Sequence, residues 1–172
     1  ALADDGSGST ADISRAITHA ADDGADLLCM SLGSPLWSVE LERALSYAVG
    51  SGAIPFVAAG NNRTMVNPTP FINSPADAPT AISIAAGEVR PAAETRGGSF
   101  SAVGPDPGSA DNSSGETNGS GPDLAATGVK LTALVATDSG GVEEETLSGT
   151  SMACPSAVAC AGLLLAASGV ER

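Results

Sequence analysis

The sequence has few aromatic and few basic residues. Aromatic side chains make up only 3% of the 172 residues, so a core must be built from small aliphatic side chains, as where helices lie close against a sheet. Lys and Arg number 7 against 20 Asp and Glu, which gives a net charge of −13. This charge repels nucleic acid and anionic membrane surfaces, so we expect neither as a partner. An acidic surface with so few basic residues also suggests a protein that works in high salt.

Cysteines and long apolar runs are also scarce. Cys29, Cys154 and Cys160 form no C-x-x-C pair and lie in apolar runs, so we expect them to be small buried residues. Neither a metal site nor a cofactor is indicated. The unbroken apolar runs are far shorter than the roughly 20 residues of a membrane-spanning helix, and no basic region followed by an apolar stretch opens the chain. We therefore expect no membrane segment.

Helical and strand patterns alternate over the first 60 residues. Apolar residues from 13 to 21 follow helical spacing behind Ser9 or Thr10 as the cap, and residues 25–32 form an apolar run typical of a short strand. A second helix that Ser38 can cap precedes a continuously apolar strand over 53–59. Short links between helix and strand predict parallel strands buried on both faces. The fold class expected is α/β, a three-layer doubly wound parallel sheet.

The second half of the chain contains a long polar segment between further strands. Residues 104–122 are almost entirely small and polar, which predicts a loop insertion within a single domain that spans 1–172. Strand patterns occur at 81–86, 124–127 and 129–136, and residues 143–145 are predicted to form a solvated acidic turn. Residues 151–167 predict a helix that is apolar on all sides, which is typical of a central helix.

Ser151 and Asn61 are the residues most suited to chemistry. Ser151 lies between small residues at the start of the last helix, where unpaired N–H groups and the helix dipole favour an oxyanion. Asn61 follows a buried strand, at the edge of a parallel sheet where ligands bind. Each residue also has a purely structural interpretation, Ser151 as a helix cap and Asn61 as a turn residue.

Three segments carry a resemblance to a known family. Residues 149–155, GTSMACP, resemble the G-T-S-M-A-x-P nucleophile motif of the subtilases, the subtilisin-like serine peptidases. Residues 58–61, AAGN, resemble their oxyanion motif, and residues 30–33, MSLG, resemble their substrate-binding strand. Weaker similarities at 2–8, 99–101 and 123–128 extend the resemblance over nearly the whole chain.

The resemblance implies roles for eight residues. Ser151 would be the nucleophile of a serine endopeptidase that works through an acyl-enzyme, and the Asn61 side chain with the Ser151 N–H would form the oxyanion hole. Substrate-binding residues would be Ser31, Leu32, Gly33, Ala58, Ala59 and Gly60. The resemblance also implies protein or peptide substrates, no cofactor, and an extracellular location.

Two parts of the family pattern are absent. The family places an Asp motif and a His motif before the substrate-binding strand, and this sequence has neither. Its only histidine, His19, lies on the polar side of the first predicted helix and is expected to be solvated. We therefore expect a subtilisin-like domain whose N-terminal part is missing, with that part as a partner of this chain.

Two other functions remain as alternatives. A catalytically inactive relative could keep the groove and bind extended peptides, as the absent Asp and His would allow. An α/β-hydrolase has a similar serine between a strand and a helix, but it needs a histidine after the serine. No histidine follows Ser151 in this sequence, which argues against that fold.

Overall fold

The computed structural model describes residues 2–3, 6–63, 71–89, 95–102, 121–137 and 140–169. Helices and strands alternate in the first part, and a two-stranded hairpin precedes the last helix. The elements in chain order are α1 (Thr10–Asp22), β1 (Leu27–Met30), α2 (Val39–Gly50), β2 (Ile54–Ala58), β3 (Ile82–Val89), β4 (Thr95–Gly97), β5 (Leu124–Thr127), β6 (Leu131–Ala136), β7 (Val142–Leu147) and α3 (Thr150–Ser168). The predicted loop over 104–122 lies outside the described residues, apart from positions 121 and 122.

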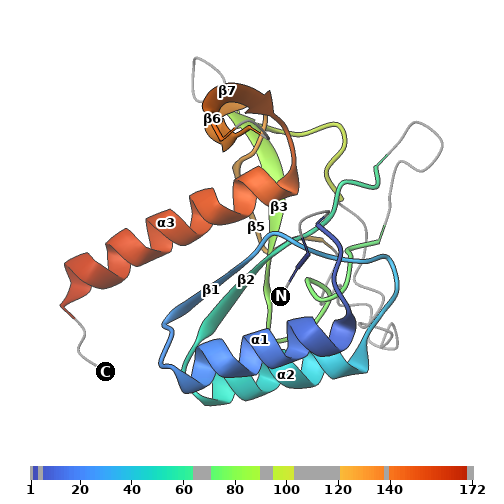
Figure 1. Cartoon of the computed structure of the whole chain (residues 1–172), viewed down its shortest axis with the longest axis vertical. Coiled ribbons are helices and arrows are strands. Elements are labelled where there is room, and N and C mark those ends of the chain that lie inside the picture. The colour runs from blue at the N-terminus through green and yellow to red at the C-terminus, as the bar shows by residue number, and fades with distance from the viewer. Residues whose placement is uncertain are drawn as a thin grey trace.

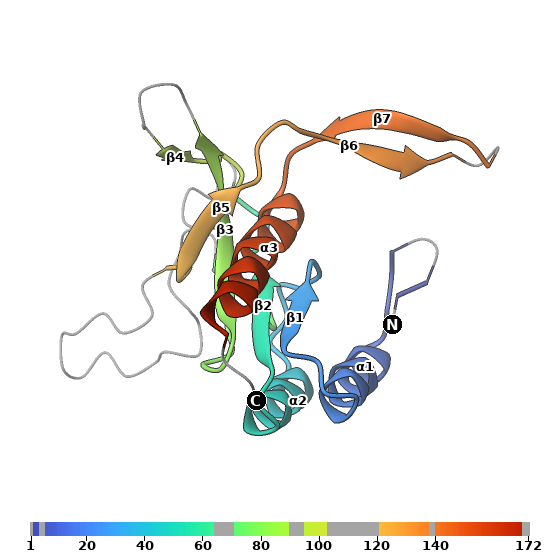
Figure 2. The ribbon, with the colours of Figure 1, turned by 90° about the vertical axis from the view of Figure 1, so that its left-hand side faces the viewer.

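A mainly parallel sheet forms the centre of the fold. Strands β1, β2, β3 and β5 are hydrogen-bonded in that order and all run parallel. The short strand β4, which the sequence did not predict, pairs antiparallel with the end of β3. Figure 2 shows the β6–β7 hairpin projecting away from this sheet.

Helices cover both faces of the sheet. One group of buried side chains joins α1 and α2 to the sheet, and a second group joins the start of α3 to the opposite face. Figure 1 shows α1 and α2 together on one side and α3 on the other. The predicted three-layer α/β fold is therefore confirmed.

Local sequence explains where the first elements begin and end. The Ser9 hydroxyl accepts a hydrogen bond from the Asp12 N–H, and the Ser38 hydroxyl accepts one from the Leu41 N–H, so both predicted caps are confirmed. Gly24 follows α1 at a φ of +81°, a conformation that favours glycine. Pro55 lies near the start of β2, as a residue without an N–H donor requires.

Three predictions were wrong. Residues 143–145 are exposed as expected, but they lie in β7 rather than in a turn. The chain reverses earlier, where the Thr137 N–H donates to the Gly141 carbonyl. Helix α3 is not central, because only Thr150, Ala153 and Cys154 are buried along its length. Cys29 and Cys160 are exposed rather than buried, because β1 is the edge strand of the described sheet and Cys160 lies beyond the buried start of α3.

Helix α3 also has the length and mean hydropathy of a membrane-spanning helix. It is the one such helix in the described parts of the chain, with a mean hydropathy of 1.6. A core helix can meet the same two conditions. Here α3 packs on β1, β2, β3 and β5, so the structure uses it as a helix that covers a sheet.

Candidate active site

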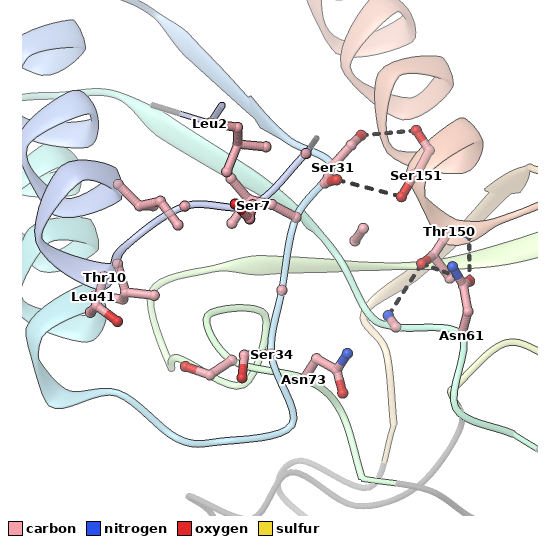
Figure 3. Close-up of a pocket in the computed structure, with 18 of the residues that line it drawn as sticks. Leu2, Ser7, Thr10, Ser31, Ser34, Leu41, Asn61, Asn73, Thr150 and Ser151 are labelled. Carbon is pink, nitrogen blue, oxygen red and sulfur yellow. Dashed lines mark hydrogen bonds between the residues drawn. The ribbon is translucent and has the colours of Figure 1, made fainter. Parts of the chain in front are cut away.

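A cavity of about 580 Å³ opens where β1 and β2 end. It lies between the segments that follow these strands, the start of α3 and the segment that leads into α1 (Figure 3). This is the carboxyl edge of the parallel strands, where α/β proteins commonly bind ligands. Predicted site residues that line the cavity are Ser31, Leu32, Gly33, Ala58, Gly60, Asn61 and Ser151.

One predicted residue does not line this cavity. Ala59 is fully buried and packs in the group of side chains that joins the sheet to α1 and α2. Its neighbour Ala58 packs on the α3 side. Alternation along the strand therefore sends Ala58 and Ala59 to opposite faces.

A hydrogen-bond network around Thr150 joins the end of β2 to the start of α3. The Asn61 Oδ1 accepts from the Thr150 N–H at 2.9 Å and from its hydroxyl at 3.1 Å, and that hydroxyl accepts from the Gly60 N–H at 3.2 Å. A backbone N–H can only donate, so the atom of the Asn61 amide that faces it must be the oxygen. The network therefore turns the Asn61 Nδ2 away from Thr150 and leaves it without a hydrogen bond to any described residue.

Ser151 lies in the first turn of α3 and contacts the end of β1. The Ser31 hydroxyl donates to the Ser151 carbonyl at 2.8 Å, and the Ser151 hydroxyl lies 3.5 Å from the Ser31 carbonyl (Figure 3). The Ser151 N–H belongs to the first turn, which has no preceding turn to bond to. Within the described residues it makes no hydrogen bond.

The two unused donors meet beside Gly149. A Cβ built on Gly149 would lie 3.4 Å from the Asn61 Nδ2, 3.4 Å from the Met152 Sδ and 3.7 Å from the Ser151 nitrogen. The space that this glycine leaves open is thus bordered by two N–H donors next to the Ser151 side chain. An oxygen atom that carries negative charge would be stabilised there.

Gly60 is required for this arrangement. It has a φ of +113°, and a Cβ on it would lie 2.8 Å from the Asn73 side chain. Asn73 is buried, and its N–H donates to the Ala59 carbonyl at 2.9 Å. A side chain at position 60 would therefore push Asn73 away and displace Asn61.

A second groove begins on the other side of Ser151. It has a volume of about 450 Å³ and lies between the β6–β7 hairpin and α3. Its lining residues are Leu131, Ala133, Val135, Glu145, Leu147, Ser151, Met152, Pro155, Ser156 and Ala159. Ser151 is common to both hollows, so an extended ligand could pass across it.

No described residue that lines the cavity at the strand ends has a titratable side chain. His19 is exposed on α1, with its Nε2 3.5 Å from the Asp23 Oδ2, and it does not line the cavity. The expectation of a solvated His19 is confirmed. A base for Ser151 is therefore not found among the described residues of this cavity.

Thr150 and Asn73 were not predicted as site residues from the sequence. Thr150 is 1% exposed and makes the hydrogen bonds that orient Asn61. It stands directly before Ser151, and its place in the same motif was the available signal. Asn73 had no such signal, because its position beside Gly60 depends on tertiary packing.

Comparisons with known proteins agree on one family. The sequence model of the Subtilase family matches residues 1–169. Thermitase of Thermoactinomyces vulgaris is 34% identical over 164 residues, which cover 95% of this chain and 48% of thermitase. The halolysin-like extracellular serine protease Nep of Natrialba magadii is 35% identical over 170 residues, which cover 97% of this chain and 26% of Nep.

A solved structure gives the same result. Sphericase superposes with a TM-score of 0.79 at 29% identity, over 99% of this chain and 54% of sphericase. The chain spans about half the length of thermitase and of sphericase. Because the family model covers nearly every residue and the relatives share the fold, this chain belongs to the subtilase family of serine peptidases.

Proposed function

We propose that the protein containing this chain is a serine endopeptidase and that Ser151 is its nucleophile. The single observation that carries this proposal is the pair of N–H donors beside Gly149, from Asn61 and from Ser151 itself. They border the position that a carbonyl oxygen would occupy once Ser151 attacks its carbon. Donors placed there stabilise the charge that develops in the transition state.

The reaction follows from this geometry. The Ser151 Oγ forms a bond to the peptide carbonyl carbon while its proton passes to a base, and the carbonyl oxygen takes up the charge. The tetrahedral intermediate then expels the amine, which receives the proton, and leaves an acyl-enzyme at Ser151. Water attacks the ester in the second half and releases the acid.

Substrate would bind in an extended form across the two hollows. The segment 31–33, in which Ser31 and Gly33 are exposed, continues β1 beyond its last paired residue, Met30, so it offers backbone groups for strand-like pairing. Ala58 and Gly60 border the same cavity with small side chains, which leaves room for an apolar substrate side chain. Residues beyond the cleaved bond would enter the groove between α3 and the hairpin.

The base would come from residues upstream of this chain. The cavity at the strand ends presents no titratable group among its described residues, and the exposed leucines of α3 form an apolar face. An upstream segment of the same protein that carries the family's Asp and His would cover this face and complete the site. On this proposal, the chain by itself has negligible hydrolytic activity.

Fluorophosphonate labelling of the natural gene product tests the proposal. A product longer than this chain, labelled at Ser151, is the expected result, and a Ser151→Ala variant is the matched control that must not label. Intact mass measured on the same sample gives the length of the product.

The second candidate is an inactive peptide-binding module, which the cavity without a described base favours. Peptide binding with no labelling of Ser151, in a product that begins at Ala1, would establish this alternative. The proposal of peptidase activity would then be withdrawn.

We also propose that the protein works outside the cell in high salt. The net charge of −13 supports this, and so does the similarity to a halolysin-like protease whose name describes it as extracellular. Salt screens the repulsion between acidic side chains, so the melting temperature should rise with salt. A melting temperature that does not change from dilute buffer to high salt would contradict the proposal.

A further inference from the structure

Two cysteines that the proposed reaction does not use meet between the sheet and α3. Cys29 in β1 and Cys154 in α3 are 125 positions apart in the chain, and their Sγ atoms lie 3.9 Å from each other. Packing of α3 against the sheet is what brings them together. Cys160, the third cysteine, is a separate exposed thiol further along the same helix.

The two thiols differ in their access to solvent. Cys154 is fully buried, and its Sγ lies 3.3 Å from the Phe56 carbonyl, to which the thiol donates. Cys29 is exposed, because β1 is the edge strand of the described sheet. A reagent in solution therefore reaches Cys29 directly, and it can reach Cys154 only through Cys29.

We propose that Cys29 and Cys154 form a dithiol site that a disulfide oxidant, such as oxidised glutathione, converts to a disulfide between β1 and α3. The sulfur atoms must move from 3.9 Å to a bond length of about 2.05 Å. Rotation of the exposed Cys29 side chain can supply most of this movement. The inference rests on the thiols and does not depend on peptidase activity.

The oxidation proceeds in two balanced exchange steps. The Cys29 thiolate attacks one sulfur of oxidised glutathione, forms a mixed disulfide and releases one glutathione thiolate. Cys154 then loses its proton to solvent and its sulfur attacks the Cys29 sulfur, which releases the second glutathione. Two protein thiols are oxidised to one disulfide, and one molecule of oxidised glutathione is reduced to two thiols.

The electrostatics of the pair determine the order of the steps. Burial first, and then the negative charge of Cys29, raise the pKa of Cys154 to about 12. Cys154 thus remains a neutral thiol while Cys29 attacks. Once Cys29 is in the mixed disulfide it carries no charge, so that part of the shift disappears and Cys154 loses its proton more easily.

The cross-link would join the two segments that hold the candidate site. Cys29 lies two residues before Ser31 and Cys154 lies three residues after Ser151, and the Ser31 hydroxyl already donates to the Ser151 carbonyl. A disulfide here would tie the start of α3 to β1. The oxidised protein should therefore unfold at a higher denaturant concentration than the reduced protein.

The test is to incubate the reduced natural gene product with oxidised glutathione, alkylate the free thiols in denaturant and map the peptides. The expected result is a peptide that links Cys29 to Cys154, the loss of two hydrogen atoms from the protein mass, and an alkylated Cys160. A Cys160→Ser variant is the matched control and should form the same link.

Single variants separate the role of Cys29, which attacks glutathione, from the role of Cys154, which resolves the mixed disulfide. Cys154→Ser should hold glutathione on Cys29 as a lasting adduct, and Cys154→Ala serves the same purpose if the serine variant does not fold. Cys29→Ser should leave Cys154 without an adduct. A lasting adduct on Cys29 of the natural protein, or alkylation of both Cys29 and Cys154 after oxidation, would overturn the proposal.

Discussion

The two ends of α3 share an apolar composition but differ in what surrounds them. Its first turn is buried and held by hydrogen bonds, with Thr150 at 1% and Cys154 at 0% exposure. Near its other end, Leu163 is 72% and Leu164 is 71% exposed. Composition alone thus predicts the same environment for both ends of α3. The structure shows a buried N-terminal end and an exposed C-terminal end. The described residues build the candidate site at one end and leave Leu163 and Leu164 exposed near the other.

Changes at Asn61 should have the largest effect on the rate of hydrolysis, because its Oδ1 accepts from Thr150 while its Nδ2 is the proposed donor to the oxyanion. In the active gene product, Asn61→Asp keeps an acceptor for Thr150 but removes the Nδ2 donor, so we expect the rate of peptide hydrolysis to fall about 10²- to 10³-fold. The fold should persist, as circular dichroism would show. Equal rates in the variant and the natural protein would exclude Asn61 as a donor to the oxyanion.

Gly149→Ala tests the open space between the two donors. Its Cβ would make only ordinary contacts, at 3.4 Å or more, and Gly149 has an extended φ of 173°, so stability should change little. The methyl group would lie against both donors and crowd the space for the oxyanion, so we expect hydrolysis to slow by about a hundredfold. An unimpaired rate would place the reacting oxygen elsewhere.

Leucines on the two faces of the sheet provide a direct comparison of stability. Leu45 of α2 is fully buried, so Leu45→Ala should lower the free energy of unfolding by about 2 to 5 kcal/mol. Leu163→Ala should change it by less than about 0.5 kcal/mol if α3 is exposed.

The same pair of variants reveals whether α3 is covered in the natural product. If Leu163→Ala lowers the free energy of unfolding of that product as much as Leu45→Ala does, an upstream segment packs on α3. Chemical denaturation of both variants gives the comparison.

Gly128→Ala should loosen the contact between β5 and the start of α3. A Cβ there would lie 2.7 Å from the Gly149 carbonyl oxygen and 2.9 Å from the Ala153 and Ala86 side chains. We expect a loss of about 1 to 3 kcal/mol in the free energy of unfolding. Gly50→Ala is the matched control, because a Cβ on Gly50 meets nothing within 4 Å. Equal effects of the two changes would contradict the tight packing at Gly128.

Cys154 should make stability depend on pH in the alkaline range. Its pKa rises from 9.0 to about 12 on folding, chiefly through burial, so the folded chain keeps a proton that the unfolded chain has lost. The neutral thiol therefore stabilises the fold below pH about 9, and this contribution is lost as the pH rises toward 12. Denaturation at several pH values should show a smaller decline in Cys154→Ala, and an identical decline would contradict this account.

Much of the fold could be predicted from patterns within single segments. Helical spacing with a serine cap gave α1 and α2, and continuous apolar runs gave β1 and β2. The acidic run 143–145 was misassigned because β7 is exposed along its whole length, so it lacks the alternation that marks a strand. β4 is too short to carry such a pattern.

By itself, the sequence determined the motifs, their order and the local caps, because these depend on residues that are close together in the chain. The family resemblance predicted that Ser151, Asn61 and the segment 31–33 belong to one site, and all of them line the same cavity. Only the tertiary structure decided how Thr150 turns the Asn61 amide, that Ala59 points away from the cavity, and that Cys29 meets Cys154. The contacts of Thr150 and Cys154 join segments far apart in the chain and depend on how α3 packs against the sheet, whereas the orientation of Ala59 depends on its packing against the side that α1 and α2 cover.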